Sequence, residues 1–136
     1  MHITILDDVR DNLKSYNELL SSTFNLELIQ NPLDLITFLG KTQTDLVLLD
    51  LHMPTINGFE LYQKFKGTHP DLPVIFLSGD PSEESLIRGL NLGADDFIVK
   101  PVSLRELVAR IKNKITIKPS SNNAENILTF DGFKLY

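Results

Sequence analysis

Short apolar runs alternate with amphipathic segments along most of this chain, and that alternation limits the fold more than any other feature. After each run, apolar residues recur at the three- and four-residue spacing of a helix. Strands that alternate with helices in this way belong to parallel sheets covered on both faces. The five predicted strands are residues 3–6, 26–29, 46–49, 73–79 and 96–101. The sequence therefore predicts an α/β fold, a doubly wound five-stranded parallel sheet with helices on both faces.

The segments between these runs carry the signals of helix ends. Asn31 is placed to cap the start of the second helix. Two capping boxes, in which a cap residue is followed three positions later by an acid, are predicted: Asp80 with Glu83 for the fourth helix, and Ser103 with Glu106 for the fifth. The predicted apolar sides of the first and fifth helices consist of Val9, Leu13, Tyr16 and Leu20, and of Leu104, Leu107, Val108 and Ile111.

Composition narrows the class of protein. The 136 residues are 42% hydrophobic, enough for one domain with its own core, and include no cysteine for a disulfide or a thiolate metal site. No apolar run approaches the roughly 20 residues that span a bilayer, and the start lacks the basic residues of a signal peptide. A net charge of −5 argues against broad adhesion to nucleic acid. We therefore expect a cytoplasmic protein without membrane contact, and any DNA contact to lie elsewhere.

The composition of the chain changes after residue 117. Residues 118–126 read KPSSNNAEN, a polar stretch of the kind that connects domains. The last ten residues alternate apolar and polar around Asp131 and Gly132, a hairpin signal, yet a lone hairpin is only marginally stable. We expect one domain in residues 1–117, a linker in 118–126, and the start of a further element in 127–136.

Polar residues follow four of the predicted strands. Asp7 and Asp8 come after the first, Asp50 after the third, Ser78 at the end of the fourth and Lys100 at the end of the fifth. The carboxyl ends of parallel strands share one edge of the sheet, and ligands bind there, near the point where the strand order reverses. We therefore expect these five residues to meet in one site.

The charges of this group indicate a metal. Three carboxylates and one ammonium leave a charge of −2, and their repulsion disfavours the ionised acids unless a cation binds. Oxygen ligands suit a hard ion such as Mg²⁺. Lys100 and Ser78 could then stabilise a phosphoryl group's oxygens, with Asp50 as the nucleophile that forms an acyl phosphate.

Four motifs in order resemble the receiver domain of two-component response regulators, over residues 1–115. They are LDD near the start, LLDLHMPTINGFEL, FLSG and GADDFIVKP. The resemblance implies a flavodoxin- or CheY-like sheet with strand order 2-1-3-4-5. It also implies that Asp50 accepts phosphate from the phosphohistidine of a sensor histidine kinase, and that a cis bond precedes Pro101.

The same resemblance implies a role for each site residue. Asp7, Asp8, Asp50 and the main-chain carbonyl of His52 would arrange Mg²⁺, while Ser78 and Lys100 would bind the phosphoryl oxygens. Phe97 stands where the family has an aromatic that swings inward when the hydroxyl residue moves to the phosphoryl group. Taken singly, such residues are more often structural: paired acids cap helices, and a phenylalanine fills a core.

The stretch ADDFIVKPVSLREL is further similar to the OmpR/PhoB subfamily, and residues 127–136 resemble the opening strands of its winged-helix DNA-binding domain. This resemblance implies a transcriptional output, with DNA bound only through an effector domain that these residues lack. It also implies a homodimer on phosphorylation, through the fourth helix, fifth strand and fifth helix.

The expected dimer face has acidic and basic positions around an apolar patch. Asp95, Asp96 and Arg110 occupy the charged positions, but Leu86 stands where the family usually has a basic residue, so Glu106 is expected to lack its partner. The charged residues could instead be solvated or paired within one chain. The patch would consist of Ile87, Leu90 and Val108.

Other classes of protein share parts of this pattern. A haloacid-dehalogenase-type Mg²⁺-dependent phosphatase needs a second aspartate two residues after the first, and here that position is His52. A flavodoxin needs a phosphate-binding loop after the first strand, where this chain has acids. A degenerate receiver that never takes phosphate is the nearest alternative, although every acceptor-site position is filled. We expect no enzyme beyond self-catalysed phosphotransfer and autodephosphorylation, and assign no role to His2 or His69.

Overall fold

The computed structural model describes most of the chain. It describes residues 1–51, 53–54, 56–79, 82, 91, 95–101 and 103–116, and every structural statement below concerns these residues. Several predictions lie outside them: the fourth helix with its Asp80–Glu83 capping box, the linker 118–126, and the element in 127–136.

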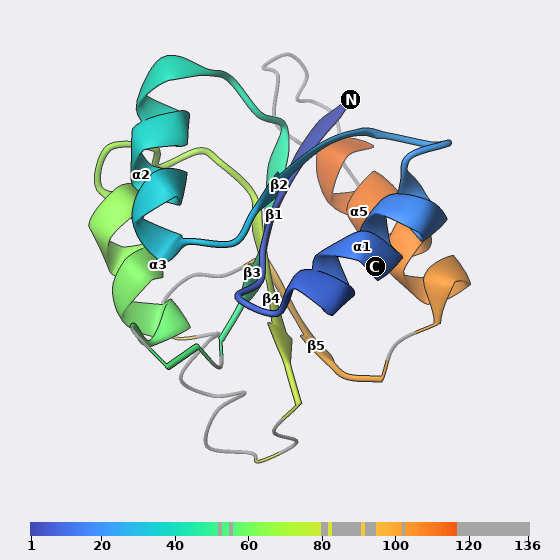
Figure 1. The fold of residues 1–136 in the computed structure, drawn as a ribbon. Helices are drawn as coiled ribbons and strands as arrows, with labels where there is room; N and C mark the ends of the chain where they lie inside the picture. The colour runs from blue at the N-terminus through green and yellow to red at the C-terminus, as the bar shows by residue number, and fades with distance from the viewer. Residues whose placement is uncertain are drawn as a thin grey trace.

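Five parallel strands form one sheet in the order β2-β1-β3-β4-β5, which confirms the predicted fold (Figure 1). The chain runs outward from β1 to β2 at one edge and then crosses back to β3 on the other side of β1, so the strand order reverses between β1 and β3. The strands are β1 His2–Leu6, β2 Asn25–Ile29, β3 Leu46–Asp50, β4 Val74–Ser78 and β5 Asp96–Val99.

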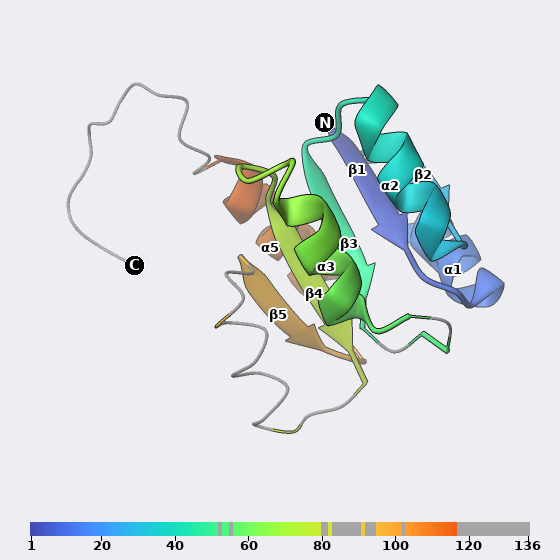
Figure 2. The same cartoon turned by 90° about the vertical axis from the view of Figure 1, so that its left-hand side faces the viewer.

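Helices cover both faces of the sheet. In Figures 1 and 2, α2 (Pro32–Lys41) and α3 (Gly58–Lys66) lie on one face, and α1 (Arg10–Leu20) and α5 (Leu104–Thr116) lie on the other. Among the described residues, no helix is both long enough and apolar enough to cross a membrane.

The apolar strand residues divide between two cores because successive side chains of a strand point to opposite faces. In β3, Val47 and Leu49 pack beneath α2 and α3, whereas Leu46 and Leu48 pack beneath α1 and α5. All four side chains are fully buried, which explains why this strand is a continuous apolar run rather than an alternating one.

Aromatic rings fill the core beneath α3. The ring of Phe76 from β4 meets Phe59 at 5.3 Å, Tyr62 at 5.1 Å and Phe97 at 6.4 Å between centroids, each in an edge-on arrangement. Edge-on pairs of this kind are favoured by the charge distribution of the rings. This cluster holds α3 against the sheet.

Helix ends follow the predicted signals with one change. Asn31 accepts a hydrogen bond from the Leu33 amide at 3.0 Å, and Ser103 accepts one from the Glu106 amide at 3.1 Å. The Glu106 carboxylate, however, accepts from the Arg110 guanidinium. The predicted capping box is therefore confirmed in its serine half, while its acid pairs along the helix.

Two predicted apolar positions lie at the surface. Val9 precedes the first turn of α1 as its cap and is 46% exposed, and Leu104 at the start of α5 is 38% exposed. Both satisfy the helical spacing, and both lie at the amino end of their helix. Leu13 and Leu20 are buried as predicted.

At the end of the sheet where the strands begin, His69 connects two helices. Its Nε2 lies 3.1 Å from the carbonyl oxygen of Leu39 near the end of α2, and its Nδ1 lies 2.9 Å from Thr68 Oγ1. The Thr68 hydroxyl in turn donates to the carbonyl oxygen of Phe65 in α3. The ring thus links the carboxyl ends of α2 and α3.

Candidate functional site: an acidic cluster at the sheet edge

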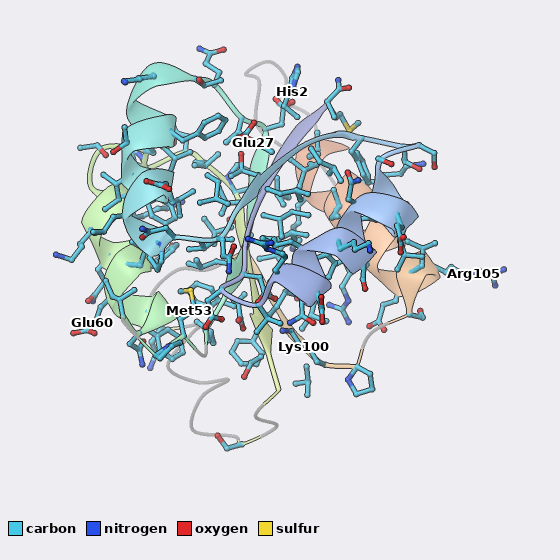
Figure 3. The ribbon with its side chains drawn as sticks, in the orientation of Figure 1. His2, Glu27, Met53, Glu60, Lys100 and Arg105 are labelled. Carbon is cyan, nitrogen blue, oxygen red and sulfur yellow. The ribbon has the colours of Figure 1, made fainter. Side chains whose placement is uncertain are left out.

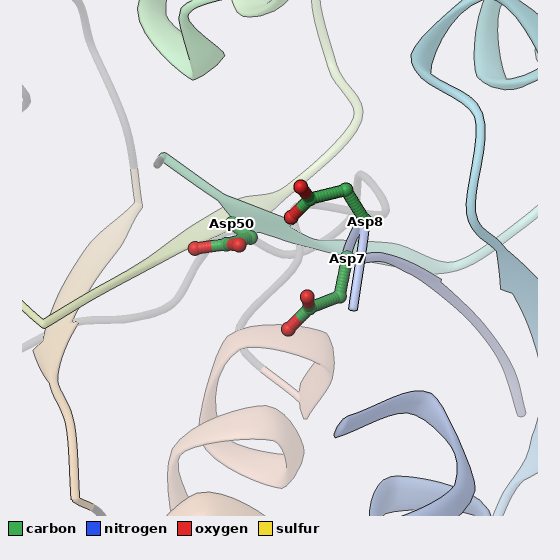
Figure 4. A group of neighbouring side chains, drawn as sticks. All are labelled: Asp7, Asp8 and Asp50. Atoms are coloured by element: carbon green, nitrogen blue, oxygen red, sulfur yellow. The ribbon is translucent and has the colours of Figure 1, made fainter. Parts of the chain in front are cut away.

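Three carboxylates meet where β1 and β3 end. One oxygen from each of Asp7, Asp8 and Asp50 lies within 4.8 Å of the others (Figure 4). The pairing of Leu6 with Leu49 sets the two strand ends level, so that Asp7 emerges beside Asp50. Asp7 is fully buried and Asp50 is 4% exposed. The strand order reverses here, as the sequence predicts for the site.

Lys100 reaches two of the three acids. Its Nζ lies 3.5 Å from Asp7 Oδ2 and 3.6 Å from Asp50 Oδ1. Figure 3 shows Lys100 at the end of the molecule opposite His2, where the strands finish. The ammonium group therefore offsets part of the charge of a pair of buried carboxylates.

Ser78 completes the group at the end of β4. It is fully buried, and its carbonyl oxygen accepts a hydrogen bond of 2.7 Å from the amide of Lys100. The register pairs Asp50 with Leu77, which brings Ser78 to the level of the residue after Asp50. The structure thus brings together Asp7, Asp8, Asp50, Ser78 and Lys100, while His52 lies outside the described residues.

The two neighbouring acids differ in their hydrogen bonds. Asp7 Oδ1 accepts from the amide of Val9 at 2.9 Å, and Asp7 Oδ2 accepts from the side-chain amide of Asn12 at 3.1 Å. Asp8 Oδ1, in contrast, is a buried oxygen without a hydrogen-bond partner among the described residues. A buried acceptor of this kind needs a donor or a cation.

This arrangement fits a hard divalent cation. All ligand atoms in the group are oxygens, the three acids exceed the one ammonium by two charges, and Asp8 Oδ1 has an unused lone pair. Mg²⁺ prefers such a set, with water or substrate oxygens completing its coordination. Asp7, Asp8 and Asp50 are therefore the residues that could hold it.

The pKa of Tyr16 reflects the negative charge of the site. Burial raises the pKa of its phenol above the usual value, and the carboxylates of Asp7 and Asp50 raise it further. The phenol stays neutral because an ionised oxygen would be desolvated and would face two anions. The sequence placed Tyr16 on the apolar side of its helix, and the structure shows it half-buried there.

Gly58 is a site residue whose role the sequence did not reveal. A Cβ atom at this position would lie 2.8 Å from the carbonyl oxygen of Asp50 and 2.8 Å from Cα of Leu51. Its amide donates to the carbonyl oxygen of Leu51 at 3.2 Å. The start of α3 can therefore lie directly on the backbone that carries Asp50 because residue 58 has no side chain.

Phe97 lies in the core. Its side chain is 8% exposed and packs edge-on against Phe76. The peptide bond between Lys100 and Pro101 is cis, as the family resemblance implies.

The charged residues of the expected dimer face pair within the chain. Arg110 contacts both carboxylate oxygens of Asp96, at 2.9 and 2.8 Å, and Glu106 at 3.0 Å. Asp95 accepts a hydrogen bond of 2.8 Å from the amide of Val74. The intrachain pairing that the sequence left open is thus observed, and within the chain Glu106 has Arg110 as its partner. Leu86, Ile87 and Leu90 lie outside the described residues.

A comparison with known protein families decides the class. Residues 3–112 match the model of the response regulator receiver domain. The chain belongs to this family. Its members are receivers, so the match also sets aside the phosphatase and flavodoxin alternatives.

Relatives of known name agree with this assignment. This receiver is 30% identical over 137 residues to response regulator MprA of Mycobacterium avium (strain 104), covering 99% of this chain and 60% of the relative. It is 34% identical over 143 residues to response regulator SaeR of Staphylococcus epidermidis, covering 98% of this chain and 59% of the relative. The chain therefore spans about three fifths of the length of these relatives.

Solved structures show the same fold. A receiver domain protein (CheY-like) from Methanospirillum hungatei JF-1 has a TM-score of 0.79 at 30% identity, covering 85% of this chain and 93% of that one. DrrB, an OmpR/PhoB homologue from Thermotoga maritima, has a TM-score of 0.74 at 30% identity, covering 85% of this chain and 52% of its own. The resemblance to OmpR/PhoB regulators is therefore also found among solved structures.

Proposed function

We propose that this receiver is phosphorylated on Asp50 by a sensor histidine kinase, with Mg²⁺ bound, and controls a transcriptional output. The observation that carries the proposal is the buried group of Asp7, Asp8 and Asp50 with Lys100 at ion-pair distance. A buried charge is retained at a cost in stability, so such a group indicates chemistry rather than packing.

The proposed reaction is a phosphoryl transfer between side chains. A carboxylate oxygen of Asp50 attacks the phosphorus of a phosphohistidine, the P–N bond breaks, and its electron pair stays on the imidazole. Asp50 then carries an acyl phosphate. Mg²⁺ would supply positive charge for the phosphoryl oxygens, held by Asp7, Asp8, Asp50 and, by family resemblance, the carbonyl of His52.

Lys100 and Ser78 are proposed to bind the phosphoryl group. Lys100 bridges Asp7 and Asp50, so its ammonium already lies beside the carboxylate that would be modified. Its charge would offset part of the negative charge that the phosphoryl group adds. Ser78 would contribute its hydroxyl, and Phe97 would respond to the movement of Ser78 through the core that it shares with Phe76.

The partners follow from the same proposal. The kinase supplies the phosphohistidine, and DNA would be bound only through an effector domain outside these residues. Phosphorylation would promote a dimer through the fourth helix, β5 and α5. In this chain Arg110 already holds Asp96 and Glu106, so forming the dimer would require sharing or exchange of these ion pairs. We therefore expect the dimer to be weak.

Intact mass spectrometry tests the proposal. With acetyl phosphate and Mg²⁺, the protein is expected to gain one phosphoryl group, and both Asp50→Asn and chelation of the metal are expected to abolish the gain. Asp45→Asn, at the other end of the sheet, is the matched control and is expected to be phosphorylated normally. Labelling of the Asp50→Asn protein, or labelling that survives chelation, would contradict the proposal.

A further inference from the structure

Asn12 is a polar residue of α1 whose side chain lies against the acidic cluster. It is half-buried in the first turn of the helix, and its Nδ2 donates to Asp7 Oδ2 at 3.1 Å. The same oxygen of Asp7 lies 3.5 Å from the ammonium of Lys100. Asn12 and Lys100 therefore contact the same oxygen of Asp7, and Lys100 also contacts Asp50.

The hydrogen bonds of Asp7 hold its carboxylate from both sides. The amide of Val9 binds one oxygen at 2.9 Å and Asn12 binds the other. The torsion that orients an aspartate carboxylate is broad, so a carboxylate without such donors samples many orientations. Without Asn12, Oδ2 would keep only its longer contact of 3.5 Å to the ammonium of Lys100, and the plane of the carboxylate would be less firmly held.

We propose that Asn12 is a positioning residue for the cation site, which orders Asp7 before Mg²⁺ binds. This inference rests on the proposed function, because it takes Mg²⁺ as the ion. A site that is already ordered loses less freedom on binding and so binds more tightly. Asp8, whose Oδ1 has no hydrogen-bond partner among the described residues, remains available to the ion while Asp7 is held in place.

The helix supplies this order without adding charge. Asn12 and Tyr16 are four residues apart, and so lie on the same side of α1. An amide is neutral, and the phenol of Tyr16 stays neutral because burial, Asp7 and Asp50 raise its pKa. A lysine or arginine at position 12 could also hold Asp7, but it would cancel part of the charge that attracts the cation. A neutral donor avoids that loss.

Calorimetric titration with MgCl₂ tests the inference. Asn12→Leu, which keeps the size and removes the donor, is expected to weaken Mg²⁺ binding about three- to tenfold, the effect of one ordinary net hydrogen bond. Asn12→Gln is expected to recover part of the affinity. Asn17→Leu, on an exposed position of the same helix, is the control, and melting in EDTA shows that each variant is folded. Asn12→Ala replaces Asn12→Leu if that variant does not fold.

A double-mutant cycle separates positioning from a general structural role. In an Asp7→Asn background, Asn12→Leu is expected to change Mg²⁺ affinity less than twofold, because the group that Asn12 orders has lost its charge. Equal losses in both backgrounds, or wild-type affinity for Asn12→Leu, would overturn the inference alone. Failure of the wild-type protein to bind Mg²⁺ would overturn the proposed function and this inference with it.

Discussion

The two ends of the parallel sheet handle polar groups differently. At the amino ends of the strands, Asp45 accepts from the amide of His2 at 2.8 Å, and Thr44 accepts from Thr4 and donates to the carbonyl of His2, both at 2.9 Å. At the carboxyl ends, three acids lie together and Lys100 contacts two of them, while a buried oxygen of Asp8 has no hydrogen-bond partner among the described residues.

This difference separates groups that hold the fold from groups that serve its chemistry. Satisfied hydrogen bonds stabilise the amino end, whereas repulsion among the acids is expected to lower stability at the carboxyl end unless a cation binds. Functional sites commonly show this compromise. The substitutions below test it, starting with the largest expected effect.

Gly58→Ala is expected to damage the carboxyl end most. The new methyl group would lie 2.8 Å from the backbone of Asp50 and Leu51, so α3 or the end of β3 must move. We expect the free energy of unfolding to fall by about 1–3 kcal/mol and phosphorylation of Asp50 to slow. Urea denaturation and intact mass spectrometry measure the two effects.

Gly40→Ala is the matched control for this substitution. Gly40 lies in α2 with no atom within 4 Å of the position of a Cβ, so alanine is expected to stabilise the helix by about 0.5–1 kcal/mol. Destabilisation of equal size at both glycines would show that close approach at Gly58 is not the cause.

Asp8→Asn is expected to change the response to Mg²⁺. Removing one of three neighbouring carboxylates relieves repulsion, so the free energy of unfolding without metal is expected to rise by about 1 kcal/mol. The wild-type protein should gain about 2.7 kcal/mol at a Mg²⁺ concentration 100 times its Kd, and the variant should lose most of that gain. Thermal melts with Mg²⁺ and with EDTA measure both effects. Equal metal responses in the two proteins would argue against the site.

Asp45→Ala is expected to cost stability alone. The substitution removes the hydrogen bond to the amide of His2, for an expected loss of about 0.5–1 kcal/mol. The Mg²⁺-dependent rise in melting temperature should match that of the wild-type protein. A reduced metal response would mean that the two ends of the sheet are coupled, contrary to the distinction drawn above.

Arg110→Met is expected to have the smallest effect on the fold. Arg110 is 39% exposed and pairs with Asp96 and Glu106, so its removal should lower the free energy of unfolding by no more than about 1 kcal/mol. The same variant sharpens the dimer proposal. Sedimentation with beryllium fluoride should show weaker association than for the wild-type protein; unchanged association would place the interface elsewhere.

The fold and most of the site could be predicted because both depend on simple regularities. Buried parallel strands are continuous apolar runs, and their carboxyl ends share an edge, so the sequence alone predicts that Asp50 and Lys100 lie close together. The pair of Glu106 and Arg110 could also have been predicted, because residues four apart are neighbours on a helix.

Other features depend on tertiary distances that a sequence does not contain. Gly58 stands in a stretch that reads as a turn, and only the approach of α3 to Asp50 gives it a second role. Asn12 reaches the site only because the carboxylate of Asp7 points toward its side-chain amide. Val9 fits the helical spacing of the apolar residues but is exposed, so the spacing alone did not show which of them are buried.

The site draws its charged residues from both ends of the domain sequence, with Asp7 after the first strand and Lys100 after the last. During biosynthesis, a ribosome that has translated only the first four strands has made all three acids but not their ammonium partner. The ion pairs that organise the site therefore form only after the fifth strand has left the exit tunnel and joined the sheet. Assembly of the acidic cluster with its ammonium partner is in this way tied to completion of the domain.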